Sequence, residues 1–306
     1  DSVSGRQGAD RQASRRFRRG HDTGQDGRIR GGGDSLRGAV VPHPPGLITL
    51  LTDFGDRDSF VASMKGVILT INPHATLVDL SHHVPPHSVE DAAYLLNSCY
   101  RYFPKGTVHV AVVDPGVGSA RRPLIAKSER YFFLAPDNGL LTHILADNRE
   151  MEVREIENAD YRLPSAGHTF DGRDLFAPAA AWLTKQQSFE SFGRLVTDCK
   201  TFTIPTPTWE GKALVGEIVH VDRFGNLISN LTQQHLEEVR SVSKHRQLSI
   251  RIGKRTIEGL VASYSEGTEE QPSVLINSDG RLEIFVKEAS AADFLKVGRG
   301  VRIEVS

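Results

Sequence analysis

Residues 108–122 read Val-His-Val-Ala-Val-Val-Asp-Pro-Gly-Val-Gly-Ser-Ala-Arg-Arg, and this is the most informative stretch of the chain. An apolar, β-forming run ends in the carboxylate of Asp114. A Pro-Gly turn follows, and Arg121 comes seven residues after Asp114. In an open α/β sheet, ligands bind at the carboxyl ends of the strands. The stretch therefore predicts a buried strand whose end carries a candidate reaction centre.

Two further stretches repeat this arrangement. The run that begins at Leu47 ends in Asp53, and the run that begins at Tyr131 ends in Asp137-Asn138-Gly139. An Asp or Asn in such a place is often only a turn residue that hydrogen-bonds its own backbone. Three such strand ends together predict one polar crevice, in which Asp53 could bind a ribose diol. Either Asn138 or Asn226 could bind an adenine edge, although each could instead only support a turn.

Strand and helix patterns alternate from Leu47 onward. Apolar residues at helical spacing predict helices, and short β-type runs separate them. The expected helices span 58–71, 88–100, 139–147 and 173–186, and the expected strands span 47–51, 76–80, 108–113 and 131–135. We predict an α/β N-terminal domain with a Rossmann-like layered sheet over residues 45–200.

The pattern changes after about residue 200. Residues 201–208 contain two prolines and are typical of a linker. Short β runs follow, with hairpin turns expected at Gly253-Lys254 and Asp279-Gly280; the runs span 213–221, 247–252, 255–261, 273–277, 281–287 and 301–305. Residues 209–306 are therefore predicted to form a small all-β domain.

Composition excludes several classes of protein. The formal net charge of −1 creates no global field that would recruit nucleic acid or an anionic membrane. No apolar segment reaches the roughly 18 residues of a membrane span, and residues 1–44 contain no signal-peptide core. Two cysteines are too few for a disulfide framework, so we expect a cytoplasmic protein, although one isolated bridge stays possible.

Residues 1–44 are rich in Arg, Gly, Asp and Ser and nearly free of large apolar side chains. Such a segment cannot bury enough surface to offset its ordering entropy, so a disordered extension is expected. The alternative is a basic arm for nucleic acid, through Arg15-Arg16 and Arg18-Arg19, but five Asp residues dilute its charge.

The common cofactor motifs are missing from the sequence. It contains no P-loop, no Gly-x-Gly-x-x-Gly fingerprint and no Gly-x-Ser-x-Gly elbow. A metal site is the remaining alternative, with carboxylate and imidazole candidates at Asp53, Asp79, His82, His83 and Asp114. Adjacent histidines usually point to different faces, which argues against this site.

Seven motifs occur in an order that strongly resembles the S-adenosyl-L-methionine (SAM) hydroxide adenosyltransferases, which are adenosine-forming SAM hydrolases related to the SAM-dependent fluorinase and chlorinase. The motifs are Thr52–Gly55, Lys65–Val67, Val112–Arg121, Ala135–Gly139, Thr169–Asp174, Asp222–Asn226 and Asn277–Gly280. The resemblance covers residues 47–306 and implies an α/β domain followed by a β-barrel domain. It also implies a homotrimer, with SAM between the N-terminal domain of one subunit and the C-terminal domain of its neighbour.

The resemblance assigns roles residue by residue. Asp53 matches the carboxylate that holds the ribose hydroxyls, and Asp114 and Arg121 match two members of an Asp-Arg-His group that activates water. The remaining expected substrate-binding residues are Asp58, Asn138, Asp222, Phe224, Asn226 and Ser278. Neither a metal nor a cofactor is expected, because the sulfonium leaving group of SAM is already activated.

One departure from the family pattern bears directly on activity. Relatives read Thr-Phe-His-Gly-Arg-Asp, but Asp171 stands here at the histidine position, and His168 lies three residues earlier. We expect SN2 attack of water on C5′ of SAM, with Asp114, Arg121 and Asp171 as the catalytic residues. The alternatives are a SAM-dependent halogenase and a SAM- or nucleoside-binding homologue with impaired turnover.

Overall fold

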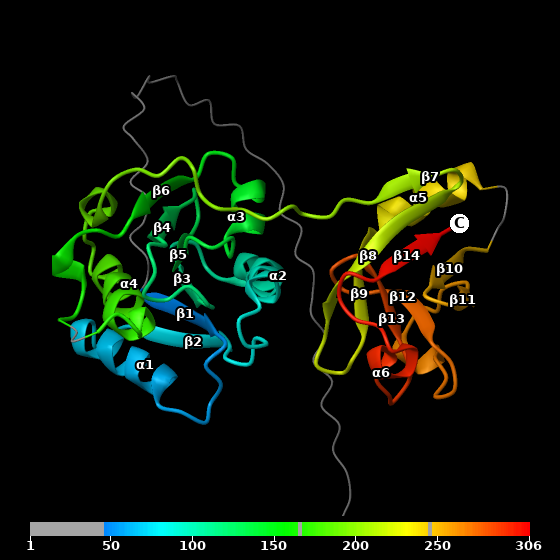
Figure 1. Ribbon diagram of the computed structural model, residues 1–306, viewed down its shortest axis with the longest axis horizontal. Helices are drawn as coiled ribbons and strands as arrows, with labels where there is room; N and C mark the ends of the chain where they lie inside the picture. The colour runs from blue at the N-terminus through cyan, green and yellow to red at the C-terminus, as the bar shows by residue number, and fades with distance from the viewer. Residues whose placement is uncertain (1–45, 165–166, 244–246) are drawn as a thin grey trace, which may run out of the picture. The chain divides into compact units, whose positions relative to one another are not determined.

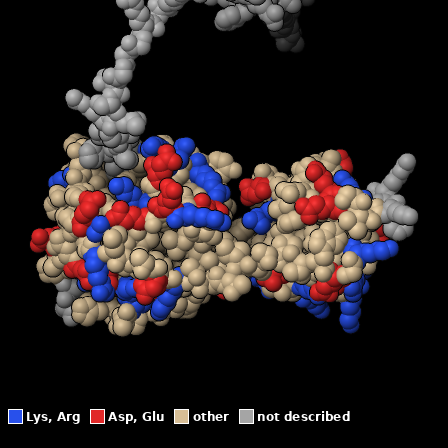
Figure 2. Space-filling model, turned by 90° about the horizontal axis from the view of Figure 1, so that it is seen from above, with Lys and Arg blue, Asp and Glu red and all other residues tan. Residues whose placement is uncertain are grey.

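The computed structural model of the chain describes residues 46–164, 167–243 and 247–306 (Figure 1). The disordered extension expected over residues 1–44 lies outside this described part. Within it, no helix has the length and apolar character that a bilayer crossing requires. Basic and acidic side chains are interspersed on the face seen in Figure 2, in keeping with the net charge of −1.

A six-stranded mixed sheet forms the centre of the N-terminal region, in the order β2-β1-β3-β5-β4-β6. Strands β2, β1, β3 and β5 are parallel, whereas β4 runs antiparallel to both of its neighbours. The strands are β1 (Leu47–Thr52), β2 (Thr76–Ser81), β3 (Val108–Val112), β4 (Pro123–Lys127), β5 (Phe132–Pro136) and β6 (Glu152–Glu155). A short hairpin joins β4 to β5, and such a connection requires antiparallel pairing.

Helices cover both faces of this sheet (Figure 1). Successive strand residues point to opposite faces, so Leu50 packs in the cluster of α1 (Phe60–Ile71) and α4 (Ala177–Thr184), and Leu51 packs with α2 (Val89–Cys99). Helix α3 (Thr142–Asp147) contributes to the second cluster. Short 3-10 turns span Tyr100–Tyr102, Ala159–Tyr161, Phe189–Phe192 and Tyr264–Glu266. The expected α/β layering is therefore confirmed.

The C-terminal region is one antiparallel, barrel-like sheet in the order β11-β10-β14-β8-β9-β13-β12, with β7 paired to β8 (Figure 1). Its strands are β7 (Thr208–Glu210), β8 (Ala213–Val221), β9 (Leu227–Thr232), β10 (Ser249–Ile252), β11 (Arg255–Glu258), β12 (Ser273–Ile276), β13 (Arg281–Phe285) and β14 (Arg302–Val305). The turn at Gly253-Lys254 joins β10 to β11 as expected, since Ile252 pairs with Arg255. Asp279-Gly280 lies in the turn between β12 and β13.

The expectation of an all-β C-terminal domain is wrong in one respect. Two helices, α5 (Gln233–Val242) and α6 (Ala291–Leu295), accompany the sheet. Helix α5 forms because Thr232 and His235 make a reciprocal capping box and because Leu236 and Val239 bury one face. The capping box was not evident from the sequence, because His235 stands where the usual motif has Glu or Gln, and β runs surround this helix of ten residues.

The helix expected over 173–186 is a composite. It begins with a π-helical turn, η3 (Gly172–Phe176), and continues as α4. Turns of this kind are rare and are frequent at functional sites. Here the turn comes directly after Asp171.

Candidate active site

The carboxyl ends of β1, β3 and β5 lie side by side at one edge of the α/β sheet. Thr52 pairs with Val112 in the register of β1 and β3, and β5 is the other neighbour of β3. The residues that follow these strands, Asp53, Asp114 and Asp137, are therefore brought to one edge, as the sequence predicted.

Asp114 and Arg121 form a buried ion pair. The Arg121 Nε donates to Asp114 Oδ2 at 2.7 Å, and the side chains are 4% and 6% exposed for Asp114 and Arg121 respectively. A tight loop brings them together: Val117 N–H donates to the Asp114 carbonyl at 3.2 Å, and Gly118 has φ +78°. A Cβ at Gly118 would lie only 3.0 Å from the His168 carbonyl oxygen, so this position requires glycine.

Asp171 completes a group of three charged side chains, in which two carboxylates bind the same guanidinium. Arg121 Nη2 donates to Asp171 Oδ2, and the Asp171 side chain is 17% exposed. Burial alone would lower the pKa of Arg121, but its bonds to Asp114 and Asp171 outweigh burial and raise that pKa. Arg121 is thus a permanent cation that holds two carboxylates together.

One carboxylate oxygen of this group has no protein partner. Asp114 Oδ1 is buried and, among the described residues, nothing donates to it. An unsatisfied buried acceptor is costly unless water or a ligand hydrogen-bonds to it. Gly116 lies beside it, since a Cβ there would be 3.6 Å from Oδ1. The arrangement can therefore hold one small hydrogen-bond donor next to a guanidinium.

His168 does not replace the missing imidazole. The residue is exposed, and it is its backbone carbonyl that packs against Gly118. Asp171 occupies the place beside Arg121 instead. The replacement of the family histidine by Asp171 therefore puts a carboxylate in place of an imidazole in this group.

Asp53 is held in place by a loop that follows β2. The His87 N–H donates to Asp53 Oδ2 at 2.9 Å, from a residue with φ +68°. Next to it, Thr52 Oγ1 and His82 Nδ1 are 2.8 Å apart. The other Asp53 oxygen has no hydrogen bond within the described ranges, so it can face a ligand.

Two other residues expected to bind substrate have different surroundings. Asp58 is exposed, just before α1. Asn138 Nδ2 donates to the Val113 carbonyl at 2.9 Å, and its Oδ1 accepts from Leu140 N–H, so its amide supports the turn. Neighbouring Asp137 is 2% exposed and binds Arg122, which makes it structural.

The five candidate metal ligands do not come together. In the parts of the chain that are described, no three His, Cys, Asp or Glu side chains form a cluster suited to a metal ion. Asp79 pairs with Lys65 at 2.6 Å and with His82 at 3.0 Å, and these contacts lower the pKa of Asp79 although its burial acts in the opposite direction. His83 is exposed and faces Asp56 at 3.6 Å.

Three aromatic rings pack beside Asp171. Phe54, Phe60 and Phe170 contact one another at centroid distances of 5.2 to 5.7 Å. A Cβ at Gly172 would lie 3.1 Å from Phe170 and 3.2 Å from Met64. A larger residue at Gly172 would therefore push against these side chains.

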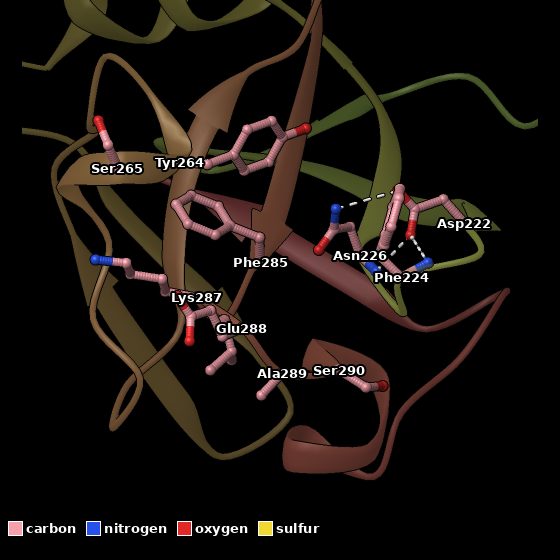
Figure 3. A pocket seen from close by; sticks show the side chains of 11 residues that line it. Asp222, Phe224, Asn226, Tyr264, Ser265, Phe285, Lys287, Glu288, Ala289 and Ser290 are labelled. Carbon is pink, nitrogen blue, oxygen red and sulfur yellow. Dashed lines mark hydrogen bonds between the residues drawn. The ribbon is translucent and has the colours of Figure 1, made fainter.

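The C-terminal region contains a separate cavity of about 750 Å³ (Figure 3). Three expected substrate-binding residues line it: Asp222, Phe224 and Asn226. Asp222 Oδ1 accepts from the N–H groups of Phe224 and Asn226, at 2.9 and 2.8 Å, and this bonding shapes the loop. The Phe224 ring is left 76% exposed, ready to cover a flat ligand.

Sequence reasoning missed the opposite wall of this cavity. Tyr264 and Phe285 form it, edge to face at 4.9 Å, and Figure 3 shows them next to each other. Neither Tyr264 nor Phe285 belongs to a recognisable sequence motif, so their contact could not be predicted from the sequence. Ser278 lines a different cavity, of about 400 Å³, with Asp279 and Arg281.

Comparisons with known proteins give matches to both regions of the chain. Residues 48–193 match the SAM hydroxide adenosyltransferase N-terminal domain, and residues 216–304 match the C-terminal domain. An (R)-S-adenosyl-L-methionine hydrolase from Salinispora tropica is 33% identical over 267 residues, covering 86% of this chain and 98% of the relative. The hydrolase of the same description from Thermus thermophilus is 33% identical over 265 residues, covering 84% and 98%.

A fluorinase from an Actinoplanes species is less similar, with 28% identity over 290 residues, covering 85% of this chain and 97% of the relative. Among solved structures, an uncharacterized conserved protein from Thermotoga maritima superposes with a TM-score of 0.77 at 33% identity, covering 84% of this chain and 99% of that one. The similarity thus extends over both regions of the chain.

Proposed function

The chain belongs to the SAM hydroxide adenosyltransferase family, and from that premise we propose that it hydrolyses S-adenosyl-L-methionine to adenosine and L-methionine. The observation that carries the proposal is the buried group in which Arg121 binds both Asp114 and Asp171. It lies at the carboxyl edge of the α/β sheet, next to Asp53, where such sheets bind ligands.

We propose that the attacking water sits on the unpartnered Asp114 Oδ1. That oxygen would accept a hydrogen bond from the water and orient its lone pair, and the Arg121 charge would favour a developing hydroxide. The oxygen of water forms a bond to C5′ of the ribose while the C5′–S bond breaks, and the electron pair leaves with the methionine thioether. One proton of the water passes to a carboxylate of the group.

Asp171 takes the place of the family histidine, and we propose that the two carboxylates share the role of base. Both bind Arg121, so a proton accepted by one leaves the other to balance the guanidinium charge. Asp171→His and Asp171→Asn distinguish a site in which the Asp171 carboxylate acts as base from a site that the loss of the family histidine has impaired. A lower rate in Asp171→Asn supports the carboxylate as base, whereas a large gain in Asp171→His would mean that the natural site is impaired.

Charge neutralisation explains why a dry site suits the reaction. A sulfonium cation and an incipient hydroxide lose their opposite charges in the transition state, so removal of bulk water lowers the barrier. The fully buried Phe176 ring, 5.8 Å from the Arg121 guanidinium, supplies such surroundings on one side of the group. Because the sulfonium is already an activated leaving group, we propose that no metal or cofactor takes part, and activity should survive EDTA.

Halide transfer is the alternative that the fluorinase relatives raise. It requires donors around an anion, but Asp114 and Asp171 place two carboxylates there. Gly172 offers no hydroxyl, and its aromatic neighbours leave no room for one without a shift. We therefore expect no halogenated product when the protein is incubated with SAM and chloride or fluoride.

We further propose that the barrel-like region supplies the other half of the site. Phe224 would cover adenine, Asn226 would read its edge, and Ser278 would hold methionine. The homotrimer implied by the family would bring this half from a neighbouring subunit. Activity should then fall when the assembly dissociates on dilution, as size-exclusion chromatography with parallel assays would reveal.

The proposal includes the expected cytoplasmic location, which the free thiols of Cys99 and Cys199 favour.

The experiment that tests the proposal is incubation of purified protein with SAM, with products identified by chromatography. Adenosine and methionine in equal amounts are the expected result. Binding of SAM in a calorimetric titration without any product would instead support a binding homologue with impaired turnover.

A further inference from the structure

A buried carboxylate in the barrel-like region lies outside the catalytic group. Glu283 is in the middle of β13 and is 3% exposed. Its neighbours Leu282 and Ile284 point into the apolar core, so Glu283 points to the opposite face with Phe285, which lines the cavity of Figure 3. A buried charge is expensive unless it is hydrogen-bonded, so its position requires an explanation.

Each oxygen of this carboxylate binds a different part of the fold. Tyr264 Oη donates to Glu283 Oε1 at 2.6 Å, and Asn277 Nδ2 donates to Oε2 at 3.0 Å. Among the described residues, Glu283 forms no ion pair with a basic side chain. Two neutral side chains therefore stabilise the carboxylate, and the carboxylate in turn fixes both of them.

The first bond orients a wall of the cavity. Burial and the bond to Glu283 raise the pKa of Tyr264, so its hydroxyl stays protonated and remains a donor. The ring is thereby held edge to face against Phe285, at a centroid distance of 4.9 Å. Both rings line the cavity that we assign to adenosine.

The second bond orients the turn that carries Ser278. With its Nδ2 on Glu283, Asn277 turns its Oδ1 toward the N–H groups of Asp279 and Arg281, each at 3.0 Å. These bonds close the turn between β12 and β13. Ser278, which we assign to methionine, lies inside that turn.

We propose that Glu283 is a positioning residue that couples the aromatic wall at Tyr264 to the Ser278 turn, so that one side chain sets the affinity for both halves of the substrate. This inference rests on the proposed function, because it assumes that the cavity and the turn hold adenosine and methionine. Glu283 itself touches no ligand in this account. It acts through Tyr264 and Asn277.

Three substitutions test the coupling by separate titrations of adenosine and of L-methionine. Glu283→Leu removes both bonds, and each ligand should bind about tenfold more weakly, the usual effect of losing hydrogen bonds to a charged group. Glu283→Gln should bind both ligands nearly as tightly as the natural protein. Its amide oxygen still accepts from Asn277, and its NH₂ can donate to the Tyr264 oxygen. Tyr264→Phe should weaken adenosine alone.

Glu304→Gln is the matched control, because Glu304 lies on β14 of the same sheet and binds Arg302 and Arg251 away from the cavity. It should leave both affinities unchanged. Glu283→Leu should also raise KM for SAM while kcat changes little. If Glu283→Leu lowers the melting temperature but leaves both affinities intact, Glu283 is merely structural and the inference is wrong. If Glu283→Leu does not fold, an unchanged adenosine affinity in Tyr264→Phe overturns it.

The outcomes also separate this inference from the proposed function. A natural protein that binds neither adenosine nor methionine would contradict the proposed function itself. A natural protein that binds both ligands, together with a Glu283→Leu variant that loses only one of them, would contradict the coupling alone.

Discussion

The charged group that we propose as catalytic, in the α/β region, and the cavity of the barrel-like region are built in opposite ways. Asp114, Arg121 and Asp171 are buried, charged and bonded to one another, with one carboxylate oxygen left over. The cavity is open and aromatic, and its Phe224 ring is 76% exposed. One site is complete before a ligand arrives, whereas the other offers a surface that a ligand has to cover.

This difference assigns distinct tasks to the two regions. Groups that stabilise charge in a transition state work best when they are already oriented, because no reorganisation is needed during the reaction. A stacking surface contributes to binding in the ground state and the transition state alike. Changes in the first region should therefore lower kcat, and changes in the second should raise KM.

The largest effect should come from Arg121→Met. Two buried carboxylates would lose their shared cation, so kcat should fall by at least about 10³-fold and the free energy of unfolding by about 3–5 kcal/mol. Initial rates with SAM and urea unfolding measure the two quantities. Arg122→Met is the control, because Arg122 binds Asp137 and Asp198 outside the group. Equal rates for the two variants would contradict the assignment of the chemistry to the group of Asp114, Arg121 and Asp171.

Asp114→Asn keeps the shape of the side chain but replaces a carboxylate that can take up a proton by a neutral amide that cannot. We expect kcat to fall by about 10²-fold, the lower limit of the usual effect of removing a general base. The effect is small because Asp171 remains bound to Arg121 and can still accept the proton. KM should stay close to its natural value. Saturation kinetics measure both constants, and a rise in KM at constant kcat would assign Asp114 to binding instead.

Phe224→Ala tests the other side of the comparison. Loss of a stacking ring should raise KM about tenfold, while kcat stays nearly constant. Phe224→Tyr keeps the ring and should keep KM. A loss confined to kcat would contradict the assignment of the cavity to ground-state binding.

The last prediction concerns acid stability of the α/β region and no catalytic constant. His109 is fully buried in β3, with Thr49 Oγ1 at 2.8 Å from its Nδ1, and burial lowers the pKa of His109 to about 3. The unfolded chain therefore binds a proton that the folded chain does not, between about pH 6.5 and pH 3. Stability is lost as the pH falls through that window.

Replacing His109 by Phe and Thr49 by Val removes both the imidazole and the hydroxyl that it satisfies. Between pH 8 and pH 5, the double variant should lose less of its free energy of unfolding than the natural protein, by up to about 2 kcal/mol. Urea unfolding at pH 5 and pH 8 measures this, with pH 8 as the control because the imidazole is neutral there in both states. Identical pH dependence in the two proteins would show that another group carries the acid sensitivity.

Strand-end residues were the most predictable part of this molecule. The runs before Asp53 and Asp114 are apolar and end in turn residues, so local sequence alone was enough to place both carboxylates at one edge. Strand β4 was not expected, because its five residues begin with Pro123 and follow the loop of two arginines without a turn signal of their own. Its antiparallel direction depends on pairing with β5, which local patterns do not encode.

The grouping of Asp114, Arg121 and Asp171 was predicted only in part from the chain itself. Spacing joined Asp114 to Arg121, but Asp171 lies 50 residues beyond Arg121 and came from the resemblance to a family. The bonds of Glu283 to Tyr264 and Asn277 were not predicted, since they depend on side-chain directions across two strands and a turn. Asn138 was expected to bind adenine, yet its amide donates to the Val113 carbonyl. It therefore supports the turn, which was the alternative role for an Asn at a strand end.

The central claim is that Asp114, Arg121 and Asp171 direct a water molecule to C5′ of SAM. Incubation with SAM in water enriched in oxygen-18, followed by mass spectrometry of both products, tests it most directly. The account predicts that adenosine carries one oxygen-18 atom at its 5′ hydroxyl and that methionine carries none, with the reaction much slower in Asp114→Asn. Intact SAM, or adenosine without the label, would contradict it.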